Sequence, residues 1–319
     1  MTRGSYDVEV QHWVPRFLLK NFADSDGRVY RFDIADDSLS KPPPKYAAAR
    51  PNFNLLMVGG EPVSFEARFQ KIETAAARAI GDIVTQKSLS MLTGRQRQAI
   101  AVFVAAQSFR TEAYRRGLQA PGKPVDIGSA FDQLWGSLPH LAAMIARRLW
   151  ALMEVGDEDA FYLGDSPVVL QSTEYPGKAM EIGLDMSGIE AFLPLSPTLA
   201  LYMPCASVGA EIVNGYHAAI AMSAWPLARA ELEARGETLA VQLAERAIAR
   251  TGTLYRSLVQ GSAFAADPEN VENLNFLQCA WASSAIYSNR PDFSFARRIF
   301  TENPSYRRVM PVRLVARWD

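Results

Sequence analysis

Three long stretches in the first half of the chain carry apolar residues at helical spacing. They cover residues 64–83, 93–116 and 128–155, and the first has apolar side chains at positions 65, 69, 72, 76, 80 and 83. This spacing places the apolar side chains on one side of a helix. In the second stretch, Thr93 followed by Gln96 matches a capping box, in which each side chain binds the backbone N–H of the other residue. The pattern therefore predicts three long amphipathic helices.

Elsewhere, apolar residues alternate with polar ones or form short runs. Residues 28–34 alternate clearly and residues 4–10 more weakly, and short apolar runs broken by Gly, Pro and Ser occupy 160–203, among them 180–184. Both patterns are typical of strands. Residues 312–318 are expected to close the fold as a strand or a strap. Helical spacing returns later in the chain, at about 228–260, 271–288 and 292–301.

The order of these elements indicates the fold class. Strands come first, helices follow, and a second group of strands precedes a second group of helices. Such segregation is typical of an α+β fold rather than of regularly alternating strands and helices. We therefore expect a helix-rich single domain over 1–319 with a mostly antiparallel sheet of short strands. Its expected parts are an N-terminal strand, helix and hairpin (5–60), a helical part (64–156), a strand-rich part (160–224) and a helical C-terminal part (228–319).

The charge of the chain narrows the range of partners. The 319 residues include 33 Lys and Arg and 34 Asp and Glu, so the formal net charge is −1. A protein that coats duplex nucleic acid needs an excess of basic residues to neutralise phosphates. We therefore expect no duplex nucleic acid as a partner.

Cysteine content and the longest apolar runs bear on metal binding and location. Cys205 and Cys279 are the only cysteines, and neither belongs to a Cys/His cluster of the kind that binds zinc. The N-terminus lacks the apolar segment of a signal peptide, and no apolar run approaches the roughly 20 residues of a membrane span. These features predict a cytoplasmic protein that does not enter the membrane.

Two charged residues lie within apolar helical stripes. Glu73 shares a face with Phe69, and Arg110 continues a stripe that includes Val104 and Gln107. A charge that faces a core is costly unless it is paired or hydrogen-bonded. Three interpretations are open. Glu73 reaches water at the helix flank, Arg110 pairs with Glu73 and joins two helices, or Arg110 and Gln107 bind an anionic group beside Glu73 as a site carboxylate.

Three further polar residues stand where elements are expected to end or to pack. His12 precedes the first short helix, where its imidazole either caps backbone groups or acts as an acid or base near neutral pH. Asp165 lies in a Gly-Asp-Ser-Pro segment between two predicted strands and is either a turn former or a site residue. Asn275, one helical turn before Gln278, either holds a loop as part of a buried amide pair or contacts a substrate.

Several of these residues fall in segments that resemble a known family. Residues 11–22 resemble the opening H-x-V-P-x-x-x-L-x-x-F of the bacterial domain-of-unknown-function family 4238. Residues 106–111 are similar to its Q-x-x-R-T, 193–197 to its P-L-S-P, and 275–288 also fit. The resemblance spans nearly the whole chain. It implies a shared polar signature without implying an activity, and the signature residues are His12, Glu73, Gln107, Arg110 and Asp165.

One part of the resemblance is imperfect. Residues 164–168 look like the family's S-D-N-P-V, but Gly164 and Ser166 replace the Ser and Asn that usually flank the aspartate. Hydrogen bonding around Asp165 is therefore expected to differ from that of the family.

The first function hypothesis is a hydrolase that acts on a phosphoester or a related ester. Its catalytic residues would be His12, Asp165 and Glu73, with His12 as general acid or base and Asp165 orienting it or helping to hold a divalent ion. The substrate would be bound by Arg110, Gln107 and Asn275. No cofactor is implied and no metal ligands are assigned, although an oxygen-rich set of this kind would suit Mg²⁺ or Mn²⁺.

The alternative is a non-catalytic binding or sensing module for an anionic small molecule or a peptide. In this hypothesis Arg110 makes the main contact and His12 contributes little. A third interpretation is purely architectural, with the same residues joining helices to the sheet. The sequence leaves the oligomeric state open.

Overall fold

The structure is a computed structural model of the whole chain. It describes residues 10–119, 126–172, 183–184, 186–221 and 225–307. The helices are α1 (Arg16–Asn21), α2 (Glu66–Gln86), α3 (Gly94–Phe109), α4 (Glu112–Leu118), α5 (Ile127–Arg147), α6 (Ala206–Ala221), α7 (Trp225–Ala234), α8 (Thr238–Gln260), α9 (Pro268–Trp281) and α10 (Ser294–Glu302). Short 3₁₀ helices cover Pro44–Tyr46 and Pro304–Arg307.

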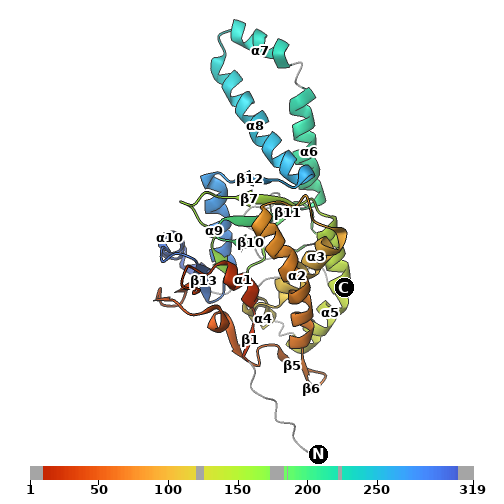
Figure 1. Cartoon of the computed structure of the whole chain (residues 1–319), viewed down its shortest axis with the longest axis vertical. Coiled ribbons are helices and arrows are strands. Elements are labelled where there is room, and N and C mark those ends of the chain that lie inside the picture. The colour runs from red at the N-terminus through yellow and green to blue at the C-terminus, as the bar shows by residue number, and fades with distance from the viewer. Residues whose placement is uncertain (1–9, 120–125, 173–182, 185, 222–224, 308–319) are drawn as a thin grey trace, which may run out of the picture.

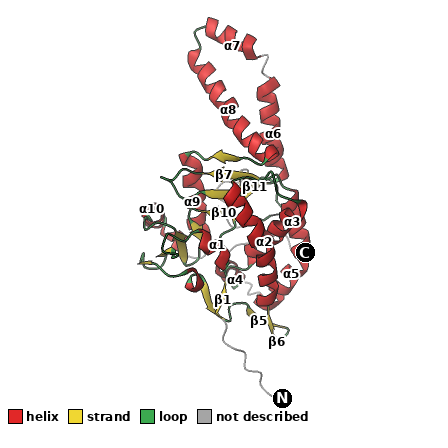
Figure 2. Ribbon diagram, in the orientation of Figure 1, coloured by secondary structure: helices red, strands yellow, loops and turns green. Residues whose placement is uncertain are grey.

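The strands are short and mostly antiparallel. They are β1 (Val10–His12), β2 (Tyr30–Asp33), β3 (Leu39–Ser40), β4 (Ala49–Pro51), β5 (Leu55–Val58), β6 (Glu61–Ser64), β7 (Ala151–Glu154), β8 (Leu163–Gly164), β9 (Val169–Ser172), β10 (Ile189–Ser196), β11 (Leu199–Pro204), β12 (Ala263–Ala265) and β13 (Ala285–Ser288). Together with the helices they form the α+β fold that the sequence predicts (Figure 2).

A five-stranded sheet with strand order β12-β7-β11-β10-β9 has both faces buried. All its neighbouring strands are antiparallel except β12 and β7, which are parallel. Successive side chains of a strand point to opposite faces. Leu193 of β10 and Leu201 of β11 therefore face one core, whereas Phe192 and Tyr202 face another.

The first core lies between this sheet and a layer made by α2, α3 and α5. Helix α3 packs against both α2 and α5, and most of its second half is buried. Phe69 of α2, Phe109 of α3 and Phe131 of α5 meet there, with the Phe109 and Phe131 rings 5.6 Å apart and nearly perpendicular. The predicted helical stripes therefore bury against one another and against the sheet.

The second face of the sheet is covered by α9 and by the base of a long helical arm. Leu274 and Leu277 of α9 and Leu258 of α8 contribute to this core. The arm consists of α6, α7 and α8, and it extends away from the body of the molecule (Figure 1). Among the described residues, no helix is both long and apolar enough to cross a membrane.

A four-stranded sheet, β3-β2-β13-β8, lies beside these layers and packs against α10. Strand β13 is its link to the rest of the chain, because it pairs with β2 from the N-terminal part and with β8 from the middle. The small β1–β4 ribbon lies nearby, since Ala49 of β4 and Tyr287 of β13 border the same pocket. Segments 12–51, 163–165 and 283–288 therefore meet in one region.

Several predicted elements are confirmed. Helix α2 covers the first predicted stretch, and the capping box of Thr93 and Gln96 starts α3. Strand β2 forms within residues 28–34. The proline-containing strand β10 is irregular, because its pairing with β11 shifts between Pro194 and Ser196.

Other boundaries predicted from local pattern are wrong. The helix expected over 93–116 ends at Phe109, and Thr111 caps a separate helix α4. The helix expected over 128–155 ends at Arg147, and its last predicted turn is strand β7. In each case a helical spacing of apolar residues continued past the true end of the helix. Pairing with a neighbouring strand then decided the conformation of β7.

Similar errors occur in the second half of the chain. Residues 271–288 form helix α9 and then strand β13, and 228–260 are divided between α7 and α8 around Gly236, whose φ is +74°. Helix α6 lies in the part expected to be strand-rich. The strand expected over 180–184 falls largely outside the described residues. So do all but the last residue of the expected 4–10 strand and the whole of the 312–318 segment.

Candidate functional site

His12 ends strand β1 and is held by the loop that precedes β4. Its Nε2 lies 3.3 Å from the carbonyl oxygen of Pro44. A carbonyl only accepts hydrogen bonds, so Nε2 carries the proton in the neutral imidazole and Nδ1 keeps its lone pair. Burial lowers the pKa of His12, and the charge of Arg110 lowers it further against the opposing effect of Glu73 and Glu66. His12 is therefore a neutral imidazole with an unprotonated Nδ1 at neutral pH.

Arg110 is the centre of a charged network between α2 and the end of α3. Its guanidinium donates through Nη1 to Glu73 Oε1, and its Nη2 lies 3.8 Å from Glu66 Oε2. The guanidinium also lies over the ring of Phe69, 4.5 Å from its centroid. Arg110 is 1% exposed. The pairing of Arg110 with Glu73, one of the interpretations of the sequence, is confirmed.

Gln107 connects this network to the chain that follows His12. Its Nε2 donates to the backbone oxygen of Trp13 at 2.7 Å. Two buried polar atoms here, Gln107 Oε1 and Trp13 Nε1, have no hydrogen-bond partner among the described residues. Buried polar groups without a partner are rare in native proteins and mark places where water or a ligand binds.

Asp165 belongs to a different network. It is fully buried just after strand β8, and it accepts four hydrogen bonds, from the backbone N–H and the hydroxyl of both Ser283 and Ser284. Burial raises the pKa of Asp165, whereas these hydrogen bonds lower it. The structure thus uses Asp165 to fix the link between α9 and β13. Asp165 is not among the charged groups that influence the pKa of His12, whereas Arg110 and Glu73 are.

Asn275 and Gln278 hold the segment that leads to Asp165. Asn275 accepts from the backbone N–H of Tyr162 and donates to Ala160 O, at 2.7 and 2.9 Å. One turn later, Gln278 accepts from Gly164 N and donates to Pro167 O. The buried amide pair that holds a loop is confirmed. Both the oxygen and the nitrogen of the Asn275 amide bind backbone groups. Asn275 is therefore a poor candidate for a substrate contact.

The two networks end at a shared pocket of about 250 Å³, here called the junction pocket. It lies between the β1–β4 ribbon and one face of the four-stranded sheet. Trp13, whose backbone Gln107 binds, lines it from one side. Ser284, whose hydroxyl donates to Asp165 at 2.5 Å, lines it from the other. The polar and aromatic lining residues are Trp13, Arg31, Ser40, Tyr46, Ser284 and Tyr287.

Arg31 supplies the charge of the junction pocket. It pairs with Asp33 through Nη2 at 2.6 Å, and its side chain keeps 30% of its surface exposed. Tyr287 of β13 is its cross-strand neighbour and lines the pocket beside it. The other polar lining groups are hydroxyls of Ser and Tyr, which donate or accept. This lining, with one cation and several donors, suits a carboxylate or phosphate group.

The sequence analysis therefore identified residues that hold the segments around this pocket, but it did not identify the residues that line the pocket. His12, Glu73, Gln107 and Arg110 come together in one network, whereas Asp165 and Asn275 lie in the other. Arg31 and Tyr287 gave no signal, because an arginine on the polar side of an alternating strand and a tyrosine in an apolar segment are ordinary. Ser284 is one of two adjacent serines within a segment that was expected to be helical.

Metal-binding side chains do not cluster among the described residues. Within them, no group of three or more His, Cys, Asp or Glu side chains is arranged to hold an ion. Glu66 and Glu73 share Arg110, and Asp165 is saturated by serine donors. The two groups of carboxylates are therefore neutralised or hydrogen-bonded by the protein itself.

The family comparison places these networks in a wider group of proteins. The family described as "Protein of unknown function (DUF4238)" matches residues 10–129 and 134–292 of the chain, which is more than half of its length. The chain belongs to DUF4238. The resemblance seen in residues 11–22 is thereby confirmed, and the matched residues of this DUF4238 protein include both networks and the junction pocket. Neither a curated protein nor a solved structure matches the chain significantly.

Replacing Arg110 by alanine is expected to destabilise this DUF4238 protein. The change leaves the Glu73 carboxylate without its cation and removes the packing on Phe69. Breaking a buried pair costs about 3–5 kcal/mol, and we expect about 3 kcal/mol because Glu73 is partly exposed. Urea denaturation measures the loss. The matched control is Arg116→Ala, whose exposed pair with Glu112 contributes about 0.5 kcal/mol; equal losses for the two variants would contradict a supporting role for Arg110.

The lowered pKa of His12 predicts a pH dependence of folding. The folded state binds fewer protons than the unfolded chain, so the free energy of unfolding falls as the pH drops from the unfolded-state pKa of His12 through its folded-state pKa. His12→Gln is expected to flatten this part of the stability profile. An NMR titration checks the cause directly. A midpoint at or above that of free histidine would show that burial does not control this imidazole.

Proposed function

We propose that this protein is a binding or sensing module for an anionic small molecule, and that the ligand occupies the junction pocket. The observation that carries the proposal is the convergence of both polar networks on this one pocket. Gln107 binds the backbone of Trp13 on one wall, and Asp165 binds Ser284 on the other. The signature residues then act as positioning residues, and Arg31 makes the charged contact.

The lining supports an anion more than a cation or a purely apolar ligand. Arg31 is the only charged side chain among the lining residues. Trp13 lines the pocket, and its buried indole N–H has no acceptor among the described residues. Tyr46 and Tyr287 add aromatic surface. Binding sites for small molecules typically combine such apolar walls with a few polar groups that fix orientation. Arg110, by contrast, is engaged by two glutamates and is almost fully buried, so it is a poor contact for a free anion.

This proposal retains the other expectations drawn from the sequence. We expect a cytoplasmic protein that does not bind duplex nucleic acid. A small ligand rather than a peptide is the preferred occupant, because about 250 Å³ lies below the usual range of roughly 300–1,000 Å³ for drug-sized ligands.

Phenyl phosphate is a suitable probe of the junction pocket. We expect it to shift the indole N–H resonance of Trp13, assigned with Trp13→Phe, and to bind at least tenfold more weakly to Arg31→Gln. The reason is that Arg31 is the pocket's only cation, and a charge-assisted contact of about 1.4 kcal/mol or more corresponds to tenfold in affinity. Titration calorimetry measures the affinity.

The matched control is Arg78→Gln, which removes an exposed arginine on α2 and changes the net charge equally. It should leave binding unchanged. An equal loss in the two variants would indicate non-specific attraction. Binding that leaves Trp13 unperturbed would place the anion elsewhere and overturn the assignment of this pocket.

A hydrolase that acts on an ester or a phosphoester is the second candidate, and one specific contact favours it. The hydroxyl of Ser284 donates to Asp165 at 2.5 Å and borders the pocket beside Arg31. In this candidate, Ser284 Oγ attacks the carbonyl carbon or phosphorus of a bound ester as its proton passes to Asp165, which is the geometry of a nucleophile beside a base. The bond to the ester's alcohol breaks, the alcohol leaves with that proton, and water then hydrolyses the ester formed on Ser284. In the hydrolase hypothesis drawn from the sequence, His12 is the general acid or base. As a base, it would accept the proton at its unprotonated Nδ1.

Release of p-nitrophenol from p-nitrophenyl acetate or phosphate, with and without Mg²⁺ or Mn²⁺, tests the hydrolase. Loss of an essential nucleophile or base is expected to lower the rate by about 10²–10⁴-fold. Ser284→Ala should do so if Ser284 is the nucleophile, and His12→Gln if His12 is the base. The control is Ser283→Ala, which removes a neighbouring donor to Asp165 that does not line the pocket. Absence of turnover in the parent protein would leave binding as the function.

A further inference from the structure

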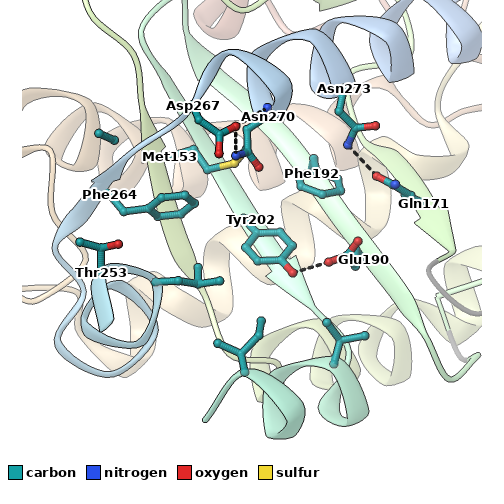
Figure 3. A pocket seen from close by; sticks show the side chains of 14 residues that line it. Met153, Gln171, Glu190, Phe192, Tyr202, Thr253, Phe264, Asp267, Asn270 and Asn273 are labelled. Carbon is teal, nitrogen blue, oxygen red and sulfur yellow. Dashed lines mark hydrogen bonds between the residues drawn. The ribbon is translucent and has the colours of Figure 1, made fainter. Parts of the chain in front are cut away.

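A second cavity lies on the other side of the molecule, between the five-stranded sheet and α9. It has a volume of about 330 Å³ and is here called the sheet cavity. Its floor is the sheet face that carries Phe192 and Tyr202, and its roof is formed by α9 and by the base of the arm. Figure 3 shows Tyr202 and Glu190 on the floor, with Asp267 and Asn270 on the helix above. None of the signature residues lines it.

Glu190 is the chemically unusual residue of the sheet cavity. It stands in an apolar run of β10 and accepts a hydrogen bond from the Tyr202 hydroxyl. Burial raises the pKa of Glu190, and the hydrogen bond from Tyr202 lowers it. No lysine or arginine is among the lining residues. Among the described residues no cation pairs with Glu190. A carboxylate that is largely removed from water is costly without such a partner, and a ligand that brings a positive charge would lower this cost.

The remaining polar groups of the cavity come from α9 and β9. Asp267 caps the N-terminus of α9 by accepting from Asn270 N, so the helix end stabilises its charge. Asn273, one turn further on, donates to Gln171 at 2.8 Å. Asp267 thus places a second carboxylate among the lining residues, on the roof of the cavity.

Aromatic side chains provide the apolar part of the cavity. The rings of Phe192 and Tyr202 stack at 5.0 Å, and Phe264 of β12 lies nearby at the other end of the floor (Figure 3). Aromatic faces attract cations, with contributions of about 0.5–2 kcal/mol each. Leu254 and Ile212 from the arm close the site with aliphatic surface. Acidic and aromatic groups together are typical of sites for organic ammonium ions.

We propose that the sheet cavity binds a small organic cation, an amine with an apolar body. Its ammonium group pairs with Glu190, and its body lies against Phe192, Tyr202 and Phe264. This inference concerns a site separate from the junction pocket and does not depend on the proposed function there.

Binding of this cation is linked to the proton on Glu190. A proton and an ammonium group compete for the same carboxylate, so the affinity for the amine rises as the pH rises through the titration of Glu190. The other titratable groups that face this carboxylate are Tyr202 from β11 and Asp267 from α9. Arg148 and Cys205 act on Tyr202 from the end of β11. Tyr202 has a raised pKa and stays protonated near neutral pH, so it keeps donating to Glu190 and does not contribute to the change of charge.

Three probes with one apolar body test the proposal on the full-length protein. They are benzylamine, which is a cation at neutral pH, benzyl alcohol, which is neutral, and phenylacetate, which is an anion. We expect calorimetry or ligand-observed NMR to show at least tenfold tighter binding of benzylamine than of benzyl alcohol. We expect phenylacetate to bind most weakly. This comparison needs no variant, so it remains decisive even where a substitution impairs folding.

Variants then locate the site. Glu190→Gln keeps the shape and the acceptor for Tyr202 but removes the charge, so it should abolish the preference for benzylamine and leave binding of benzyl alcohol. The matched control is Glu211→Gln, which removes an exposed carboxylate on α6 and should change nothing. Ile212→Trp fills the cavity and should weaken benzylamine and benzyl alcohol alike.

Three results would overturn the inference. One is equal affinity for the amine and the alcohol in the parent protein. Another is benzylamine binding that survives Glu190→Gln, and the third is binding that Ile212→Trp leaves intact. None of these results tests the junction pocket, whose ligand binding is measured separately with phenyl phosphate and the Trp13 indole resonance. Failure of that assay would in turn leave the cation site untouched.

Discussion

Buried guanidinium groups at the ends of helices are the interactions on which the rest of this structure depends. Arg110 joins the end of α3 to α2 through Glu73, and Arg115 in α4 donates to the backbone of Phe53. Arg148, just after α5, donates to the carbonyl oxygens of Leu184, Ile189 and Met203 at 2.6–3.0 Å. Burial lowers the pKa of Arg115 and of Arg148. Such groups are tolerated because oxygen acceptors bind their Nη atoms, and each fixes a helix end to another element.

This anchoring explains how short strands from distant parts of the chain form two sheets. The end of α5 is fixed to β10 and β11 by Arg148, so the chain that follows enters the five-stranded sheet as β7. Asp165 has the corresponding role in the second sheet, where it fixes the link between α9 and β13. Polar residues in apolar surroundings thus act here as joints between layers. The pockets form where such joints meet.

The two cavities differ in the charge of their lining residues. The junction pocket takes its one charge, that of Arg31, from the polar side of an edge hairpin. The sheet cavity takes its charges from Glu190 on a central strand and from Asp267 at a helix N-terminus.

The sequence by itself determined what depends on nearest neighbours along the chain. The period of α2 and the capping box of α3 follow from residues a few positions apart on one helix. The pairing of Arg110 with Glu73 joins residues 37 positions apart, and the structure selected it from three interpretations that the sequence left open. The α+β class follows from the same local patterns, and the single-domain organisation stays a prediction. Only the tertiary structure decided that 151–154 and 285–288 are strands, since their apolar residues fit either period and partner strands selected one. It also decided which side chains line a pocket, because Trp13, Arg31 and Ser284 meet through contacts between segments up to 271 residues apart.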